Sequence, residues 1–243
     1  MKNQYFGDTR DLFKYDLILE LLLKTNLNHF TFIPMLTKNE KNTNGRRINY
    51  RRAKAGTKRT TLRSFLEKCL EEDRRRIEEL ERFFRGSKLT KKMGVTIFGK
   101  NRYFSDENRE QYFESIKADL LKGSVILVDP DVGLELKNTK GRAEKYVKYK
   151  EIIDLHNHMD KDSILLIFQF IPRVEREKYF YKIGQKILEV TVKKDPVLFI
   201  SDNQIVFFIL IKDLRLLQTV ARILVDYANT YGLKIGRVTG VST

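Results

Sequence analysis

Two acidic residues follow directly on an apolar run in the stretch SVILVDPDVGLELK, residues 124–137. An acid placed directly after a buried strand needs a donor to offset the cost of burying its charge, and that donor is a substrate amine, a metal ion or a basic side chain. The pattern therefore indicates a ligand corner at Asp129, Pro130 and Asp131, which are our candidate catalytic residues. The alternative is a structural turn that Asp129 caps, in which Pro130 fixes the chain and Gly133 supplies a positive φ.

The same stretch also has the spacing of a metal-dependent nuclease. Asp131, Glu135 and Lys137 give D-x-x-x-E-x-K, which resembles nucleases of the PD-(D/E)xK type. In that type the carboxylates hold Mg²⁺ and the lysine stabilises the attacking water or the phosphate. Under this alternative Asp129, Asp131 and Glu135 are the metal ligands. The other reading of Lys137 is a solvated charge in a loop.

A basic segment between residues 38 and 63 is the second place where chemistry is indicated. It holds ten Lys and Arg residues against one acid, Glu40, so a large part of the net charge of +15 lies there. Arginine pairs interleaved with Tyr50 and threonines suit contacts to phosphates and bases. The candidate nucleic-acid-binding residues are Arg46, Arg47, Arg51, Arg52, Lys54, Lys58, Arg59 and Arg63. The alternative is a solvated loop with no partner.

The rest of the composition excludes several classes. No apolar stretch approaches the roughly 18 residues that a membrane helix needs, so we expect a soluble, cytoplasmic protein of unknown oligomeric state with no membrane partner. The single cysteine, Cys69, excludes a disulfide framework and a cysteine-cluster metal site. A basic surface attracts polyanions, which makes DNA or RNA the expected partner. The abundance of Lys, Arg, Glu and Ile is also typical of thermophiles.

The elements that position these residues follow from the hydrophobic pattern. An apolar helix begins near Asp8 or Thr9, and a β-rich run at 30–35 follows it. After the basic segment, residues 61–86 have helical spacing throughout and predict one long amphipathic helix. We therefore expect an α/β core domain made of residues 1–37 and 93–243, with a basic helical insertion at 38–92.

The remainder of the chain alternates apolar strands with amphipathic helices, which predicts a doubly wound α/β fold with a mostly parallel sheet. Two apolar runs meet at residues 201–204 with no room for a crossover helix, so they predict a C-terminal antiparallel hairpin at the sheet edge. Ligands of such sheets bind beyond the carboxyl ends of the strands. The residues at predicted strand ends are Thr37, Asn101, Arg102, Asp129, Asp131, Gln169 and Arg173.

The corner resembles that of amino methyltransferases that use S-adenosylmethionine, in which Asp-Pro-Pro-(Tyr/Phe) follows the fourth strand. Here the residues are Asp129-Pro130-Asp131-Val132, with Asp131 in place of the second proline. In that family the acid and the adjacent backbone carbonyl accept hydrogen bonds from the amine that is methylated. The resemblance implies these roles for Asp129 and the carbonyl of Pro130, and a methyltransferase-like Rossmann-type sheet.

The N-terminal residues extend the resemblance. Ribosomal RNA adenine-N6 methyltransferases of the large subunit begin with an Ala-Asp-x-x-Lys-His helix, followed by a strand and a helical insertion. This chain has Arg10-Asp11-Leu12-Phe13-Lys14-Tyr15 at that place. The implied cofactor is S-adenosylmethionine, and the implied cofactor-binding residues are Asp11, Lys14, Tyr15 and Thr37. Three-Cys-motif partner proteins are similar in the Gly-Leu that follows the corner, and YFGDTRDLFKYDL with DPDVGLE resembles a group of prokaryotic and viral proteins.

Three hypotheses follow. The first is a nucleic-acid-directed enzyme that resembles adenine-N6-type methyltransferases. The second is a protein of the same fold that has lost the cofactor and binds nucleic acid or another partner, because the segment after the first strand has no glycine before Gly45 to let a cofactor approach the backbone. The third is the Mg²⁺-dependent nuclease.

Overall fold

The structure of the chain is a computed structural model that describes residues 1–41, 48–135, 142–191 and 195–240. Of Arg52 it describes the backbone alone. The α-helices are α1 (Thr9–Lys24), α2 (Thr60–Glu71), α3 (Glu79–Gly86), α4 (Arg109–Glu114), α5 (Tyr149–His158), α6 (Arg176–Val190) and α7 (Leu214–Tyr231). The strands are β1 (His29–Ile33), β2 (Gly94–Ile97), β3 (Ser124–Val128), β4 (Gly133–Leu134), β5 (Tyr146–Val147), β6 (Ile164–Phe170), β7 (Val197–Ser201), β8 (Ile205–Ile211) and β9 (Lys234–Val238). Short 3₁₀ turns are η1 (Asn3–Tyr5), η2 (Tyr50–Arg52), η3 (Ala118–Leu121) and η4 (Ala143–Lys145).

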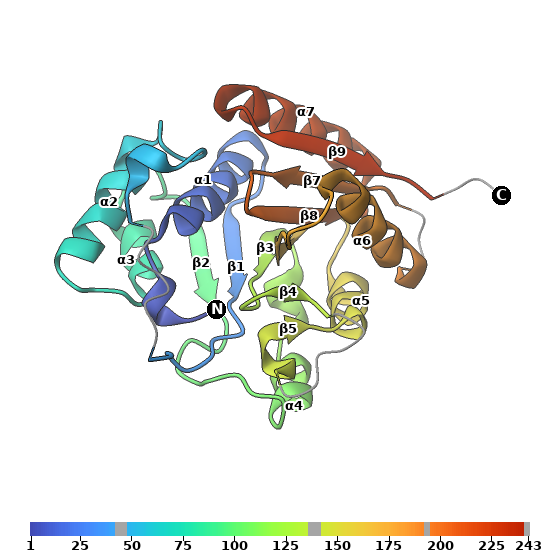
Figure 1. The fold of residues 1–243 in the computed structure, drawn as a ribbon, viewed down its shortest axis with the longest axis horizontal. Helices are drawn as coiled ribbons and strands as arrows, with labels where there is room; N and C mark the ends of the chain where they lie inside the picture. Colours follow the sequence, from blue (N-terminus) through green and yellow to red (C-terminus); the bar gives the residue numbers. More distant parts are fainter. Residues whose placement is uncertain (42–47, 136–141, 192–194, 241–243) are drawn as a thin grey trace.

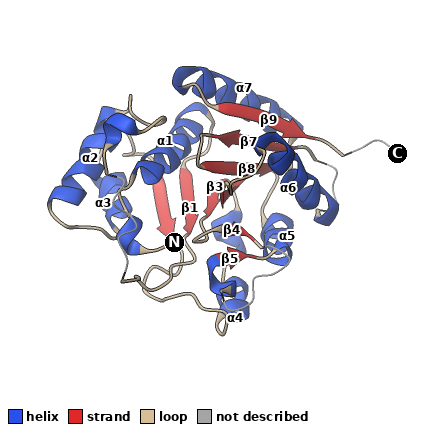
Figure 2. Ribbon diagram, in the orientation of Figure 1, coloured by secondary structure: helices blue, strands red, loops and turns tan. Residues whose placement is uncertain are grey.

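The central sheet has the strand order β2-β1-β3-β6-β8-β7-β9 (Figures 1 and 2). Strands β2, β1, β3 and β6 are parallel, whereas β8 runs antiparallel to both β6 and β7. The expected α/β class and the parallel core of the sheet are confirmed. The sheet as a whole is mixed, because its C-terminal half pairs antiparallel.

Alternating side chains divide the core between the two faces of this sheet. On β3, Val125 and Leu127 pack with α1, α2, α3 and α7, whereas Ile126 and Val128 pack with α4, α5 and α6. All four of these side chains are fully buried. The apolar run that predicted a strand covered on both faces is therefore explained by helices on each side.

The C-terminal part differs from the prediction in two ways. The antiparallel hairpin of β7 and β8 forms as expected, but β8 lies between β6 and β7, so the hairpin is not at the edge. The residues expected to form only a tail pair with β7 as strand β9. Strand β9 is short, and among its five residues only Val238 is buried, so its hydrophobic pattern is weak and the sequence did not reveal it.

The predicted single helix at 61–86 is wrong, because the chain forms α2 and α3 with a break between them. Asp73 adopts a left-handed conformation, with φ of 51°. The amide of Arg74 donates to the carbonyl of Cys69 at 2.8 Å, and that of Asp73 donates to Leu70 at 3.3 Å. This is the hydrogen-bond pattern that ends a helix, here with Asp in the position that usually takes Gly.

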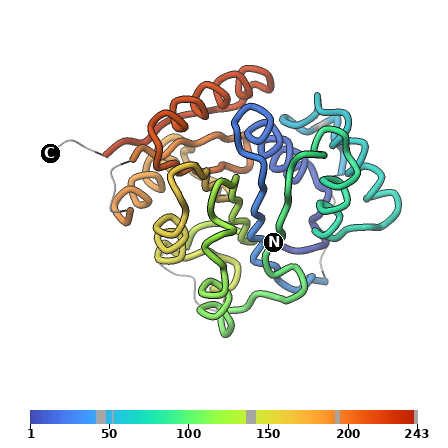
Figure 3. The backbone as a smooth tube through the Cα atoms, turned by 180° about the vertical axis from the view of Figure 1, so that it is seen from behind, coloured from blue at the N-terminus to red at the C-terminus, as the bar shows by residue number. Residues whose placement is uncertain are grey.

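The N-terminus of the chain lies in the middle of the molecule, close to the ends of β1 and β3 (Figures 1 and 3). Helix α1 begins where the sequence predicted, because the carboxylate of Asp8 accepts hydrogen bonds from the amides of Arg10 at 2.8 Å and Asp11 at 3.0 Å. Among the described residues, no helix is both long and apolar enough to cross a bilayer.

Candidate functional site

The place where this sheet is expected to bind a ligand lies between β1 and β3. The two strands pair in parallel, but the chain leaves β1 for β2 on one side and leaves β3 for β6 on the other. Such a reversal of strand order opens a crevice at the carboxyl ends of the two strands. Pro34 and Met35 follow β1 there, and Asp129 follows β3, with its amide donating to the carbonyl of Ile33 at 2.9 Å.

Asp129 is buried in this crevice and paired with a lysine. Its carboxylate contacts Lys14 Nζ at 2.6 Å, and the same ammonium contacts Asp11 at 2.9 Å. Only 1% of Asp129 and 4% of Lys14 is exposed. Burial raises the pKa of Asp129, an effect that Lys14 partly offsets, while the two carboxylates outweigh the burial of Lys14 and raise the pKa of its ammonium. The structure thus joins three of the predicted site residues in one buried ion-pair cluster.

Asp131 is paired with the first two residues of the chain. One of its oxygens lies 2.8 Å from the amino group of Met1, and the other contacts Lys2 Nζ. The hydroxyl of Thr37 donates to Asp131 at 2.8 Å, and Lys2 Nζ donates to that hydroxyl at 2.8 Å. Burial alone would raise the pKa of Asp131, but the amino group of Met1 and the ammonium of Lys2 lower it to about 2. Asp131 and Thr37, two further predicted residues, therefore form a second cluster.

Met1 closes the space between the two strand ends. Its amino group donates to the carbonyls of Pro34 at 3.0 Å, Met35 at 3.2 Å and Asp129 at 3.1 Å. The cavity that remains beside Asp129, Pro130 and Asp131 has a volume of about 30 Å³, the share of one water molecule in the liquid.

S-adenosylmethionine does not fit this corner as the chain arranges it. Pockets for ligands of that size have volumes of roughly 300–1,000 Å³, ten times the volume here or more. Leu36 and Thr37 after β1 are buried, and Met35 itself has a positive φ of 41° without being a glycine. Tyr15, the remaining residue that the resemblance assigned to a cofactor, lies in the core with its ring 6.1 Å from those of Phe6 and Phe32.

The residues after the corner are fixed by Gln169, at the end of β6. Its side-chain oxygen accepts a hydrogen bond from the amide of Leu134 at 2.7 Å. Gly133 has φ of 143°, and a Cβ there would lie 2.2 Å from the same oxygen. The sequence placed Gln169 at a strand end, and the structure shows that it holds the turn that starts at Asp129.

The three acids of the nuclease hypothesis, Asp129, Asp131 and Glu135, each contact different partners. The carboxylate of Glu135 accepts a hydrogen bond from the amide of Tyr149 at 2.8 Å, at the start of α5. Asp129 and Asp131 have the cationic partners described above. Within the described part of the chain, no three His, Cys, Asp or Glu side chains come together as a metal site. Lys137 lies outside the described residues.

The second half of the basic segment packs against α1 and the turn that precedes it. The hydroxyl of Tyr50 donates to the carbonyl of Gly7. Ala55 is buried, and Gly56 with φ of 80° lies so close to Leu12 that a Cβ would come within 2.7 Å of its carbonyl oxygen. Residues 48–59 therefore follow the surface of the first helix closely.

The eight predicted phosphate ligands have different surroundings. Arg51, Lys54 and Lys58 are exposed. Arg59 contacts Asp16 and lies 2.7 Å from Glu20, both of them on α1. Two more, Arg46 and Arg47, lie outside the described residues, and so does the side chain of Arg52.

Arg63 is the last of the set, and it lies on α2. Its Nε is 3.6 Å from Glu67, one turn further along the helix. Half-exposed pairs of this kind are weak. The side chain of Arg63 is 38% exposed, and its Nη1 also donates to the carbonyl of Thr57 at 3.5 Å.

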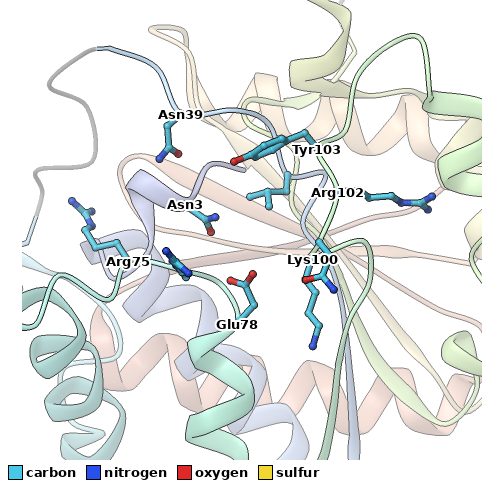
Figure 4. A pocket seen from close by; sticks show the side chains of 10 residues that line it. Asn3, Asn39, Arg75, Glu78, Lys100, Arg102 and Tyr103 are labelled. Atoms are coloured by element: carbon cyan, nitrogen blue, oxygen red, sulfur yellow. The ribbon is translucent and has the colours of Figure 1, made fainter.

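A larger cavity, which the sequence did not reveal, lies beyond the carboxyl ends of β1 and β2. Its volume is about 430 Å³. It is lined by Asn3, Leu36, Asn39, Arg75, Arg76, Glu78, Lys100, Asn101, Arg102 and Tyr103. Figure 4 shows the carboxylate of Glu78 and the amide of Asn3 pointing into the same space, with Arg75 on one side and Lys100 on the other. We call this cavity the basic pocket.

The sequence did contain a signal for the basic pocket. Asn101 and Arg102 were expected at a strand end. The three consecutive arginines at 74–76 interrupt the apolar spacing of the helical insertion. They lie in the break between α2 and α3.

No protein-family model matches the chain, and a search of curated proteins finds no match either.

Proposed function

We propose that the protein binds a nucleic acid strand through the exposed cations of its basic segment and does not transfer methyl groups at the Asp129 corner. The observation that carries this proposal is the contrast between two groups of cations. Lys2 and Lys14 are buried and paired with acids of the crevice. Arg51, Lys54 and Lys58 of the basic segment are exposed to solvent, where they are accessible to phosphates.

The insertion supports the proposal by holding these cations in place. Tyr50 donates a hydrogen bond to Gly7, just before α1, and Gly56 lies against Leu12 of α1, so the backbone of this part of the basic segment needs little ordering when a strand binds. The basic pocket adds Arg75 and Arg76, which lie between α2 and α3, and Lys100, which follows β2.

The fold proposed for this function is a methyltransferase-like Rossmann type. The order β2-β1-β3-β6-β8-β7, with β8 reversed between two strands that run in the same direction, supports this view. Its switch point carries Asp129, as the resemblance implies. We infer that the fold is kept while the crevice has become a structural ion-pair cluster.

Methyl transfer is the second candidate, and the position of Asp129 at the switch point favours it. It requires Met1 and Lys2 to leave the crevice and Lys14 to release Asp129. Under that hypothesis, millimolar S-adenosylmethionine raises the melting temperature of the protein. We expect no shift, since the corner holds a cavity of about 30 Å³.

The proposal is tested by the salt dependence of binding. Fluorescence anisotropy with labelled single-stranded RNA and DNA oligonucleotides should show binding that weakens steeply as salt rises. Replacing Arg51, Lys54 and Lys58 together by Ala should lower the slope of log affinity against log salt by about 3 if each contacts a phosphate. Replacing the exposed Lys88, Lys91 and Lys92 is a charge-matched control; absent or salt-indifferent binding would overturn the proposal.

A further inference from the structure

The basic pocket combines cations with other kinds of side chain. Besides cations it contains a carboxylate, an exposed aromatic ring and several amides. It opens beyond the ends of β1 and β2, one strand away from the filled crevice. A pocket for phosphate alone needs only the cations. The carboxylate and the aromatic ring indicate a ligand that also has a hydrogen-bond donor and a planar ring.

The cations of the basic pocket would bind an anionic group of the ligand. Arg75 is positioned by a hydrogen bond from its Nε to the carbonyl of Phe6 at 3.1 Å. Arg76 is exposed, and Lys100 contacts Glu81. The side chain of Arg102 points away from the pocket, where its Nη2 donates to the hydroxyl of Ser115 at 2.7 Å (Figure 4). Arg75, Arg76 and Lys100 are therefore the cations that an anionic group in the pocket meets.

Glu78 defines a second contact, because it is an acceptor inside this cationic cavity. Its Oε2 is buried and has no hydrogen-bond partner among the described residues. Glu78 precedes α3, but its side chain does not cap that helix. A buried carboxylate oxygen without a donor is costly, and a ligand that donates an N–H to it removes that cost. Each nucleobase offers such a donor on its edge, and guanine offers two adjacent ones.

Tyr103 supplies the third contact. Its ring lines the pocket and is 49% exposed. An exposed aromatic ring that lines a cationic pocket is a surface on which a base stacks.

We propose that the basic pocket holds one nucleotide of the bound strand. The phosphate lies against Arg75, Arg76 and Lys100, the base stacks on Tyr103, and a base N–H donates to Glu78. Guanine fits best, because its N1–H and N2–H reach both oxygens of a carboxylate. This inference rests on the proposed function for the strand, but the pocket itself is tested with a free nucleotide.

The experiment compares the affinity of the full chain for GMP and for ribose 5-phosphate by calorimetry. Ribose 5-phosphate keeps the anionic group and lacks the base. Glu78→Gln should weaken GMP binding about tenfold or more, since a hydrogen bond to a charged acceptor is lost. The same change should strengthen ribose 5-phosphate binding, because it removes a negative charge from the pocket. Glu107→Gln, at an exposed position outside the pocket, should change neither affinity.

Tyr103→Leu tests the stacking contact. It should weaken GMP binding by roughly five- to a hundredfold and leave ribose 5-phosphate unaffected. Equal effects of Glu78→Gln on both ligands, or no effect on either, would overturn the nucleotide assignment. Melting curves establish that each variant is folded.

The two proposals fail in different ways. If oligonucleotides bind with the expected salt dependence but Glu78→Gln and Tyr103→Leu change nothing, the pocket assignment is wrong and the proposed function stands. If GMP binds as described and oligonucleotides do not, the pocket assignment stands for a free nucleotide and the proposed function is wrong.

Discussion

The pairing of Lys14 with Asp129 is the contact that most clearly separates a structural corner from an open ligand site. Lys14→Met keeps the length and apolar stem of the side chain but leaves Asp11 and Asp129 buried without their shared cation. Loss of one partner of a buried pair costs about 3–5 kcal/mol. We expect a fall of that size in the free energy of unfolding.

Asp129→Asn should cost less, about 1–3 kcal/mol, because Lys14 keeps its contact with Asp11 at 2.9 Å. In the double variant, Lys14→Met with Asp129→Asn, the carboxylate of Asp129 is replaced by a neutral amide, so the loss of Lys14 leaves only Asp11 charged and without this cation. The two changes should therefore be non-additive by at least about 1 kcal/mol. Lys24→Met on the same helix is the control, since Lys24 is 45% exposed in its pair with Glu20 and should cost no more than about 0.5 kcal/mol.

Urea unfolding at neutral pH, followed by circular dichroism, measures these differences. A cost of less than about 1 kcal/mol for Lys14→Met, or strict additivity in the double variant, would refute the buried pair. Asp129 would then be free to serve a ligand.

Three further outcomes are expected. The low pKa of Asp131 means that its charged form stabilises the fold above its ordinary pKa of 3.8, and this stabilisation is lost as the pH falls toward about 2. The difference in unfolding free energy between wild type and Asp131→Asn should therefore shrink by about 2 kcal/mol from about pH 5 to about pH 2. A constant difference would contradict the pairing. Gly133→Ala should destabilise the fold by about 1–3 kcal/mol, because Gly133 has a φ of 143° and a Cβ there would meet Gln169. Gly86→Ala is the control and should not destabilise the fold, because nothing lies within 4 Å of a Cβ at Gly86. Equal melting temperatures for the two variants would show that Gln169 does not fix the turn at Gly133. Arg59→Ala should lower the melting temperature without a specific loss of oligonucleotide binding, because Arg59 is paired with Asp16 and Glu20. Lys58→Ala, at an exposed position, should weaken binding and leave stability nearly unchanged. The reverse pattern would assign the phosphate contacts to Arg59.

Local patterns predicted much of the fold. Asp8 caps the start of α1 and residues 124–128 form β3 as expected, because capping and continuous apolar runs act over a few residues. The break after α2 was missed because Asp73 in a left-handed conformation is uncommon, and the helical spacing continues in α3.

The candidate site was predictable in position but not in its contacts. The rule that places ligands at strand ends located Asp129, and the resemblance assigned Lys14 to cofactor binding. The sequence did not show that Lys14 and Asp129, 115 residues apart, satisfy each other. Nor did it show that Met1 and Lys2 neutralise Asp131. Such pairing depends on the tertiary packing of α1 and the first residues against the sheet, which no local pattern encodes.

The central claim is that a nucleic acid strand binds beside the crevice and not in it. Hydrogen exchange measured by mass spectrometry, with and without a bound oligonucleotide, tests it directly. We predict slower exchange in peptides covering residues 48–59, which carry the exposed cations of the basic segment, and in those covering 72–80 and 98–104, which line the basic pocket, with unchanged exchange at 127–135. Protection confined to 127–135 would place the ligand at the Asp129 corner and contradict the account.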